Sequence, residues 1–364
     1  MELVLISDGQ LSLDSPVRKL PFFFPARLIE MDKVSPDTVA EGKIAVIELL
    51  GSSDAGLTAL KTSWDSIAEI PVICLVSQKN RREVIQAAAL GKTEILERDA
   101  PFPLLLKRVN AHMGGDILEA LPRKTPASTA AAYKKSNTFL ESLCLSTVEG
   151  AKVRINLMNE SAEDMLGALK QDGLSCWLNA VETHHSATYC HSLQVAGLAG
   201  MLAKHLGWPD EDCKEVIAGG LVHDIGKMRI PLTILDKAGK LTSEERAMVD
   251  KHPQFGRDIL KTRLEVAPNI KRMAIQHHEY VDGTGYPNRL KGDQIIPKVR
   301  LITVCDIFAA LTEERPYRQS VPARTALDMM RNMGPKLDQK IVSKLDDMLF
   351  GRAFGAVTRE APAA

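Results

Sequence analysis

The sequence predicts an α/β domain with a parallel sheet, followed by an all-α helical domain. Short apolar runs alternate with amphipathic stretches up to about residue 115, and helical periods with few β-branched runs fill the chain beyond the interruption that follows. A length of 364 residues is enough for two domains that each bury a core. We therefore expect domains over residues 1–115 and 150–352, joined by a linker over residues 116–149, part of which could be helical.

The N-terminal domain is expected to be a parallel sheet covered by helices. Its apolar runs predict strands over residues 2–6, 44–50, 71–76 and 94–96, and an amphipathic stretch predicts a helix over residues 81–90. Strands and helices that alternate in this way are typical of a parallel sheet.

The linker is predicted from the stretch PRKTPASTAAAYKK, which is small and polar and contains two prolines. Beyond it the apolar residues recur at helical spacing. The expected helices cover residues 162–170, 191–206, 211–223, 243–262, 270–278, 298–312 and 324–333. The second domain is therefore expected to be mostly helical.

Composition excludes several classes of protein. Lys plus Arg and Asp plus Glu both count 46, so no net charge attracts a nucleic acid polymer. The first residues show no positive leader, and no segment is apolar for long enough to span a membrane, so we expect a cytoplasmic location and no membrane partner. The six cysteines are scattered without a CxxC pair, which favours reduced thiols, and we assign them no chemistry.

Histidines gather in one part of the chain, because eight of the nine lie between residues 184 and 278. Imidazole is a common ligand for transition metals, and a carboxylate adds an oxygen that can bridge two ions. The pair His223 and Asp224 in LVHDIGK supplies both, at a point where Gly226 ends a helix. Lys227 follows, and its ammonium group is a compact positive charge that could bind an anionic phosphate.

A second pattern, HHEYVDGTGYP, runs from His277 to Pro287. Gly283, Gly285 and Pro287 indicate a tight loop. An ordinary surface turn would account for these glycines, but it would not account for the two adjacent histidines before them. Lone histidines are more often satisfied or exposed residues than ligands. We assign no function to the three that fit this description, which are His112, His184 and His205.

Taken in order, HDIGK, KHPQFG, HHEYVDGTGYP and Asp306 with RPYR resemble the HD-GYP family, a branch of the HD phosphohydrolases. The resemblance covers roughly residues 150 to 350, and four motifs in order within one helical domain are specific. Members of the family are phosphodiesterases that open the bacterial messenger cyclic di-GMP, and some act on related cyclic dinucleotides. The resemblance therefore implies a cyclic dinucleotide as substrate.

The resemblance also implies a site for two divalent metal ions. One ion is expected beside His191, His223, Asp224 and Asp306, and the other beside Asp224, His252, His277 and His278, with Asp224 as the bridge. Iron is the metal most associated with the family and manganese the second, and ligands of these types leave zinc open. A hydroxide bridging the two metals would attack phosphorus in line. Catalytic roles are implied for Asp224 and Lys227, and substrate contacts for Lys227, Gly285, Tyr286, Pro287, Arg315 and Arg318.

Two departures from the family pattern bear on activity. Some relatives carry an acid one helical turn before the first histidine ligand, where it helps to hold a third metal, and here that position is Ala187. We therefore expect two metals, unless His184 or His185 takes that place. Ala309 stands where relatives often have a second aspartate. This keeps open a catalytically weak member that acts as a nucleotide-binding or protein-interaction module, and, less favoured, a hydrolase for another nucleotide.

The N-terminal domain resembles the receiver domains of two-component signalling. Asp8, Glu48, Ser77 and Arg98 stand roughly where receivers place their acids, their phosphate-accepting aspartate, a hydroxyl residue and a lysine. Glu48 in place of aspartate is not expected to be phosphorylated. The resemblance implies a degenerate receiver used for self-association or for binding a protein partner, although any short parallel α/β domain would give a similar match.

Overall fold

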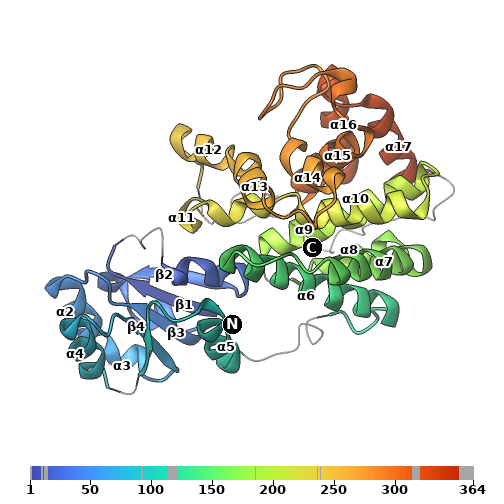
Figure 1. Cartoon of the computed structure of the whole chain (residues 1–364). Coiled ribbons are helices and arrows are strands. Elements are labelled where there is room, and N and C mark those ends of the chain that lie inside the picture. The colour runs from blue at the N-terminus through green and yellow to red at the C-terminus, as the bar shows by residue number, and fades with distance from the viewer. Residues whose placement is uncertain are drawn as a thin grey trace. The chain divides into compact units, whose positions relative to one another are not determined.

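The computed structural model describes residues 2–9, 11, 15–91, 93–113, 121–184, 186–235, 237, 239–313 and 320–351. Contacts divide the chain into two compact units, Met1–Asp116 and Ile117–Ala364 (Figure 1). The first unit holds a parallel sheet and the second is helical, which confirms the predicted fold class. None of the helices in the described ranges is both long and apolar enough to cross a membrane.

The sheet of the first unit has five parallel strands in the order β2, β1, β3, β4, β5. The strands are β1 (Glu2–Ser7), β2 (Ala26–Glu30), β3 (Gly42–Glu48), β4 (Val72–Val76) and β5 (Glu94–Glu97). Every residue of β4 is buried, as a continuous apolar run predicts for a central parallel strand. The sequence did not predict β2, because charged Arg27 and Glu30 interrupt the apolar residues of ARLIE and Leu28 is exposed on this edge strand.

Helices and short 3-10 turns surround this sheet. They are η1 (Pro16–Phe22), η2 (Met31–Lys33), α1 (Pro36–Val39), α2 (Asp54–Thr62), α3 (Trp64–Ile67), α4 (Arg81–Ala89) and α5 (Phe102–Met113). The helix predicted over residues 81–90 is confirmed as α4, and the Asn80 side chain caps it by accepting a hydrogen bond from the Arg82 amide.

Within the expected linker over residues 116–149, the structure describes residues 121–149, and most of them are helical, as a partly helical linker allows. Residues Ala127–Glu149 form α6, a helix that packs against its neighbours in the helical unit and buries Tyr133 and Phe139. The prolines taken as linker signals precede this helix, and Pro126 is its N-cap. Alanine has the highest helix propensity, so AAAYKK extends the helix instead of breaking it.

The second unit is built from packed helices and short 3-10 turns. The longer helices are α7 (Ile155–Asp172), α8 (Leu174–Val181), α9 (Ala187–His205), α10 (Asp210–Val222), α13 (His252–Leu260), α14 (Pro268–Gln276), α15 (Pro297–Thr312), α16 (Ala323–Asn332) and α17 (Gln339–Phe350). The shorter elements are η4 (Ile225–Arg229), α11 (Leu232–Leu235), α12 (Ser243–Val249), η5 (Gly292–Gln294) and η6 (Gly334–Lys336). The single helix expected over residues 243–262 is two helices, α12 and α13.

The centre of this unit is the packing of α9 against α10 (Figure 1). A Cβ placed on Gly220 of α10 would lie 2.7 Å from the Cα of Ala196 on α9, so only glycine lets the two helices approach this closely. Helix α15 packs on the same α9. This close packing brings side chains from three helices to one buried place.

Candidate metal centre

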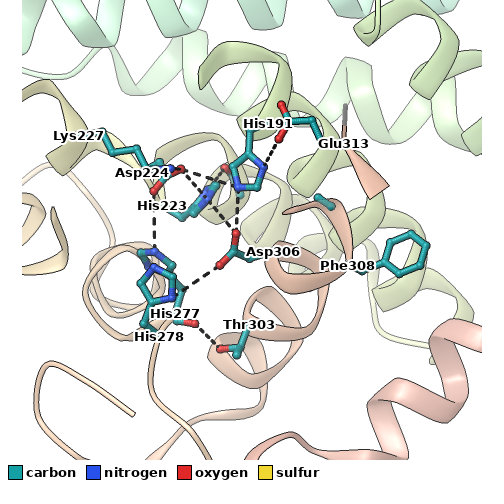
Figure 2. A network of polar contacts seen from close by, with 12 residues as sticks. His191, His223, Asp224, Lys227, His277, His278, Thr303, Asp306, Phe308 and Glu313 are labelled. Carbon is teal, nitrogen blue, oxygen red and sulfur yellow. Dashed lines mark hydrogen bonds and ion pairs between the residues drawn. The ribbon is translucent and has the colours of Figure 1, made fainter. Parts of the chain in front are cut away.

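The structure brings together all seven residues that the sequence predicted as metal ligands. His191 lies on α9 and Asp306 on α15. The other five lie at the ends of helices, where no further helical turn stands between their side chains and the cluster. Those at helix ends are His223, Asp224, His252, His277 and His278. Three overlapping groups have ligand atoms within 4.8 Å of one another: His191, His223 and Asp306; His223, Asp224 and His277; and His252, His277 and His278. Figure 2 shows the network.

Asp224 directs its two carboxylate oxygens at different histidines. Oδ2 is 3.3 Å from Nε2 of His223 and 3.8 Å from Nε2 of His191. Oδ1 is 3.3 Å from Nε2 of His252 and 3.9 Å from Nε2 of His277. A carboxylate placed in this way is able to bridge two cations.

Asp306 joins the two halves from the other side. Its Oδ1 is 2.9 Å from Nε2 of His191 and 4.0 Å from Nε2 of His223, and its Oδ2 is 3.9 Å from Nδ1 of His278. The side chain comes from the middle of α15, whose backbone fixes its position. The cluster therefore contains two carboxylates among five imidazoles, which is a donor set suited to first-row transition metals.

Backbone carbonyls determine the tautomer of three of these histidines. Nδ1 of His223 lies 2.7 Å from the carbonyl oxygen of Gly220, and Nδ1 of His252 lies 2.8 Å from that of Val249. Nδ1 of His277 lies 3.1 Å from the carbonyl oxygen of Ala274. A carbonyl only accepts, so Nδ1 carries a proton in each ring, and in a neutral ring Nε2 then carries the lone pair. All three Nε2 atoms therefore face the cluster.

The facing nitrogens of His252 and His277 are the strongest sign of a cation. Their Nε2 atoms are 3.0 Å apart, and each has its only proton on the opposite side of the ring. Burial lowers the pKa of His252 to about 3 and that of His277 well below its usual range, so no second proton separates the lone pairs at neutral pH. Nε2 of His223 is also buried without a hydrogen bond among the described residues. The residues present therefore fit a metal.

The two acids are ionised in this setting. Burial alone would raise the pKa of Asp224. The charge of Lys227, and then His223, nevertheless holds this pKa well below its usual range. Nζ of Lys227 lies 2.5 Å from Oδ2 of Asp224. His191 likewise overcomes burial to lower the pKa of Asp306. Although burial opposes the charged imidazole, Asp306 and Glu313 raise the pKa of His191 to about 9.

The glycine of HDIGK explains how two distant histidines meet. A Cβ placed on Gly226 would overlap the carbonyl oxygen of His252 and lie 2.6 Å from the amide of Gly256. The backbone of η4 can therefore rest directly on the first turn of α13 only because residue 226 has no side chain. This contact brings His252 beside Asp224.

The GYP loop lies against the cluster through His278. A Cβ placed on Gly285 would overlap the Tyr280 amide and lie 2.5 Å from the His278 carbonyl, which accepts a hydrogen bond from the Tyr286 amide at 3.1 Å. The rings of Tyr286 and His278 are stacked with centroids 4.8 Å apart. Buried Glu279 holds the rest of the loop by accepting hydrogen bonds from the amides of Asn288 at 2.6 Å and Leu290 at 2.9 Å.

Other predicted residues have different outcomes. Arg315, Arg318 and His185 lie outside the described residues. His184 belongs to none of the three groups above; its Nδ1 accepts a hydrogen bond from the Ser186 amide at 2.9 Å, next to the start of α9. Ala309 is buried on α15.

The sequence analysis missed two further residues at the site. Thr303 donates a hydrogen bond to the carbonyl of His277 at 2.8 Å, and Oε2 of Glu313 lies 3.5 Å from Nδ1 of His191. Their signal was their spacing from Asp306, because residues three before and seven after a ligand lie on the same side of a helix.

Together the fold and the cluster define a helical domain built around a buried centre of histidines and aspartates. The model of the HD domain family matches residues 155–341, just over half of the chain. The chain therefore belongs to the HD domain family, and the resemblance to its HD-GYP branch is confirmed.

Two curated relatives are 38% identical to this chain. A cyclic di-GMP phosphodiesterase of Pseudomonas aeruginosa matches over 161 residues, 44% of this chain and 39% of the relative. The 3'3'-cGAMP-specific phosphodiesterase 3 of Vibrio cholerae matches over 170 residues, 46% of this chain and 37% of the relative. This chain thus spans about two fifths of the length of these relatives.

Among solved structures, an HDG"Y"P protein from Bdellovibrio bacteriovorus is similar in fold. The TM-score is 0.51 at 18% sequence identity, and the match covers 74% of this chain and 81% of that chain. At this identity the likeness concerns the fold alone.

Proposed function

We propose that the helical unit is a metal-dependent phosphodiesterase that opens a cyclic dinucleotide, with cyclic di-GMP as the first candidate. The observation that carries the proposal is the pair of Nε2 atoms of His252 and His277, which face each other at 3.0 Å beside a two-sided Asp224 carboxylate. The activities named for the two curated relatives supply the substrate class.

The proposed ligands form two sets that share Asp224. His191, His223 and Asp306 complete the first set, and His252, His277 and His278 complete the second. Iron is the first candidate metal and manganese the second, since both take mixed imidazole and carboxylate ligands, and zinc is also compatible. When bound, such ions neutralise the charge of a phosphate and activate water at neutral pH.

Lys227 would act on the substrate through its charge. Its side chain is 19% exposed and ion-paired with Asp224, so the ammonium group lies at the edge of the cluster. There it both keeps Asp224 ionised and meets the negative charge of a phosphate. Gly285, Tyr286 and Pro287 would form the wall beside His278, and Arg315 and Arg318 remain proposed substrate contacts.

Turnover of a panel of cyclic dinucleotides by manganese-loaded protein tests the proposal. Chromatography of the products should show an opened dinucleotide or mononucleotides, and the activity should be lost in His191→Ala. His205→Ala is the matched control because His205 ends the same helix and was assigned no function. If wild-type protein with bound metal opens none of the panel, the proposal is wrong.

A second candidate is a catalytically weak member that binds a cyclic dinucleotide and signals through protein contacts. Buried Ala309 favours it, because a methyl group lies one turn after Asp306 where relatives often have an acid. Binding of a cyclic dinucleotide with a measurable constant but without hydrolysis would support this candidate over the enzyme.

For the first unit we propose a degenerate receiver that does not accept phosphate. The strand order β2, β1, β3, β4, β5 is that of flavodoxin-like sheets, a class that includes receivers. Glu48 ends β3 and is buried, and Nε of Arg98 lies 3.4 Å from its Oε1. Arg98 also pairs with Glu83 at 2.8 Å. Stoichiometric labelling by a small phosphodonor, lost in Glu48→Gln, would contradict the proposal.

A further inference from the structure

A buried acid lies on the outer side of the His191 ring. Glu313, which follows the last residue of α15, places Oε2 3.5 Å from Nδ1 of His191, while Nε2 of the same ring is 2.9 Å from Asp306. Figure 2 shows Glu313 and Asp306 on opposite sides of the ring. The Glu313 side chain is only 6% exposed. A separation of 3.5 Å is an ion-pair contact, longer than a usual hydrogen bond.

This arrangement differs from that of the other histidines with an inward Nε2. In His223, His252 and His277, the group that faces Nδ1 is a neutral carbonyl three or four residues earlier in the chain. In His191 it is a carboxylate from another element. A carboxylate beside the outer nitrogen of a ligating histidine fixes the orientation of the ring and makes the inner nitrogen a more basic, stronger metal ligand.

We propose that Glu313 is a positioning residue that holds the His191 ring with Nδ1 toward its own carboxylate and Nε2 toward Asp224 and Asp306, the side on which it would bind a metal. The proposal rests on the metal centre proposed above. Its consequence is asymmetric, because Glu313 contacts the ligand set of His191 and not the set of His252, His277 and His278. Glu313 therefore strengthens the binding of one ion of the pair.

Manganese binding to metal-free protein, measured by equilibrium dialysis, tests this without reference to turnover. Glu313→Ala should weaken the binding of one of the two ions about 10- to 100-fold, the range found when such outer partners are removed, and leave the other ion unchanged. Glu313→Gln keeps the size and an acceptor oxygen, so its loss should be smaller. Glu211→Ala removes a carboxylate that is 85% exposed on α10 and should match the wild type.

A double-mutant cycle separates positioning from a general structural role. If Glu313 acts through His191, adding Glu313→Ala to His191→Ala should cause no further loss of affinity. Wild-type affinity in Glu313→Ala, equal weakening of both ions, or a full further loss in the His191→Ala background would each overturn the inference.

The test also distinguishes this inference from the proposed activity. A wild-type protein that binds two manganese ions but opens no cyclic dinucleotide contradicts the proposed function and leaves the role of Glu313 standing. A wild-type protein that binds no manganese contradicts the metal centre, and the role of Glu313 with it.

Discussion

At the scale of single residues, the metal-ligand candidates were predictable because their chemistry is visible in the sequence. Capping explains a single histidine or aspartate at a helix end, but it does not explain the adjacent pair His223 and Asp224 or the doubled histidine at 277 and 278. The tautomers were not predictable, because they depend on carbonyls such as that of Gly220, whose positions only the fold determines. Glu313 was missed for the same reason, since its contact with His191 joins the residue after α15 to α9.

Replacing Asp224 with alanine should abolish both metal binding and turnover. Asp224 lies within 3.9 Å of two histidines from each set, so its loss removes a ligand from each ion at once. Metal analysis after dialysis, together with the turnover assay, measures this. Retention of two ions by Asp224→Ala would show that the carboxylate is not a bridge.

Replacing Lys227 with alanine should separate charge from coordination. The ammonium group is not a ligand, so Lys227→Ala should keep its metal while turnover falls, by about 10- to 1,000-fold if the lysine meets the phosphate charge in the transition state. Lys227→Arg, which preserves the charge, should recover part of the rate. Turnover at the wild-type rate in Lys227→Ala would contradict the proposed catalytic role.

At the scale of elements, the sequence predicted those with strong patterns and missed those set by tertiary packing. The central strands β1, β3 and β4 are continuous apolar runs and were predicted. The edge strand β2 carries charges and was not. Helix α6 begins with polar and small residues, so its burial of Tyr133 became apparent only from its packing against α7 and α8.

The contact between η4 and α13 should be intolerant of any side chain at position 226. A Cβ there meets backbone atoms, which cannot move aside, so Gly226→Ala should cost about 1–3 kcal/mol in the free energy of unfolding and weaken metal binding. Chemical denaturation measures the first effect. Gly167→Ala on α7 is the control, since nothing lies within 4 Å of its added Cβ, and it should be neutral or slightly stabilising. Equal stability of the two variants would refute the close approach.

At the scale of the whole molecule, the sequence predicted the two units and their order. The change from strand-like runs to helical periods extends over a hundred or more residues, so it does not depend on any single residue. The boundary was less certain, since the prolines near residue 122 precede a helix of the second unit instead of a long linker. Composition alone could not have shown that two of the acids of a neutral chain lie among five histidines in one buried cluster.

Metal removal should lower the stability of the helical unit. In the absence of metal the lone pairs of His252 and His277 oppose each other, and a bound ion stabilises the folded state by about 2.7 kcal/mol at a hundred times its dissociation constant. Thermal unfolding with and without manganese should therefore show a rise of several degrees, with a much smaller rise for magnesium, which prefers oxygen ligands. No shift with manganese would count against the centre.

Anomalous diffraction from crystals of the manganese- or iron-loaded protein tests the central claim most directly. Our account predicts two peaks on either side of the Asp224 carboxylate, one beside His191, His223 and Asp306 and the other beside His252, His277 and His278. Ala187 opens α9 without a ligand atom, so no third peak at full occupancy is expected. Three such peaks, a single peak, or peaks away from these side chains would contradict the account.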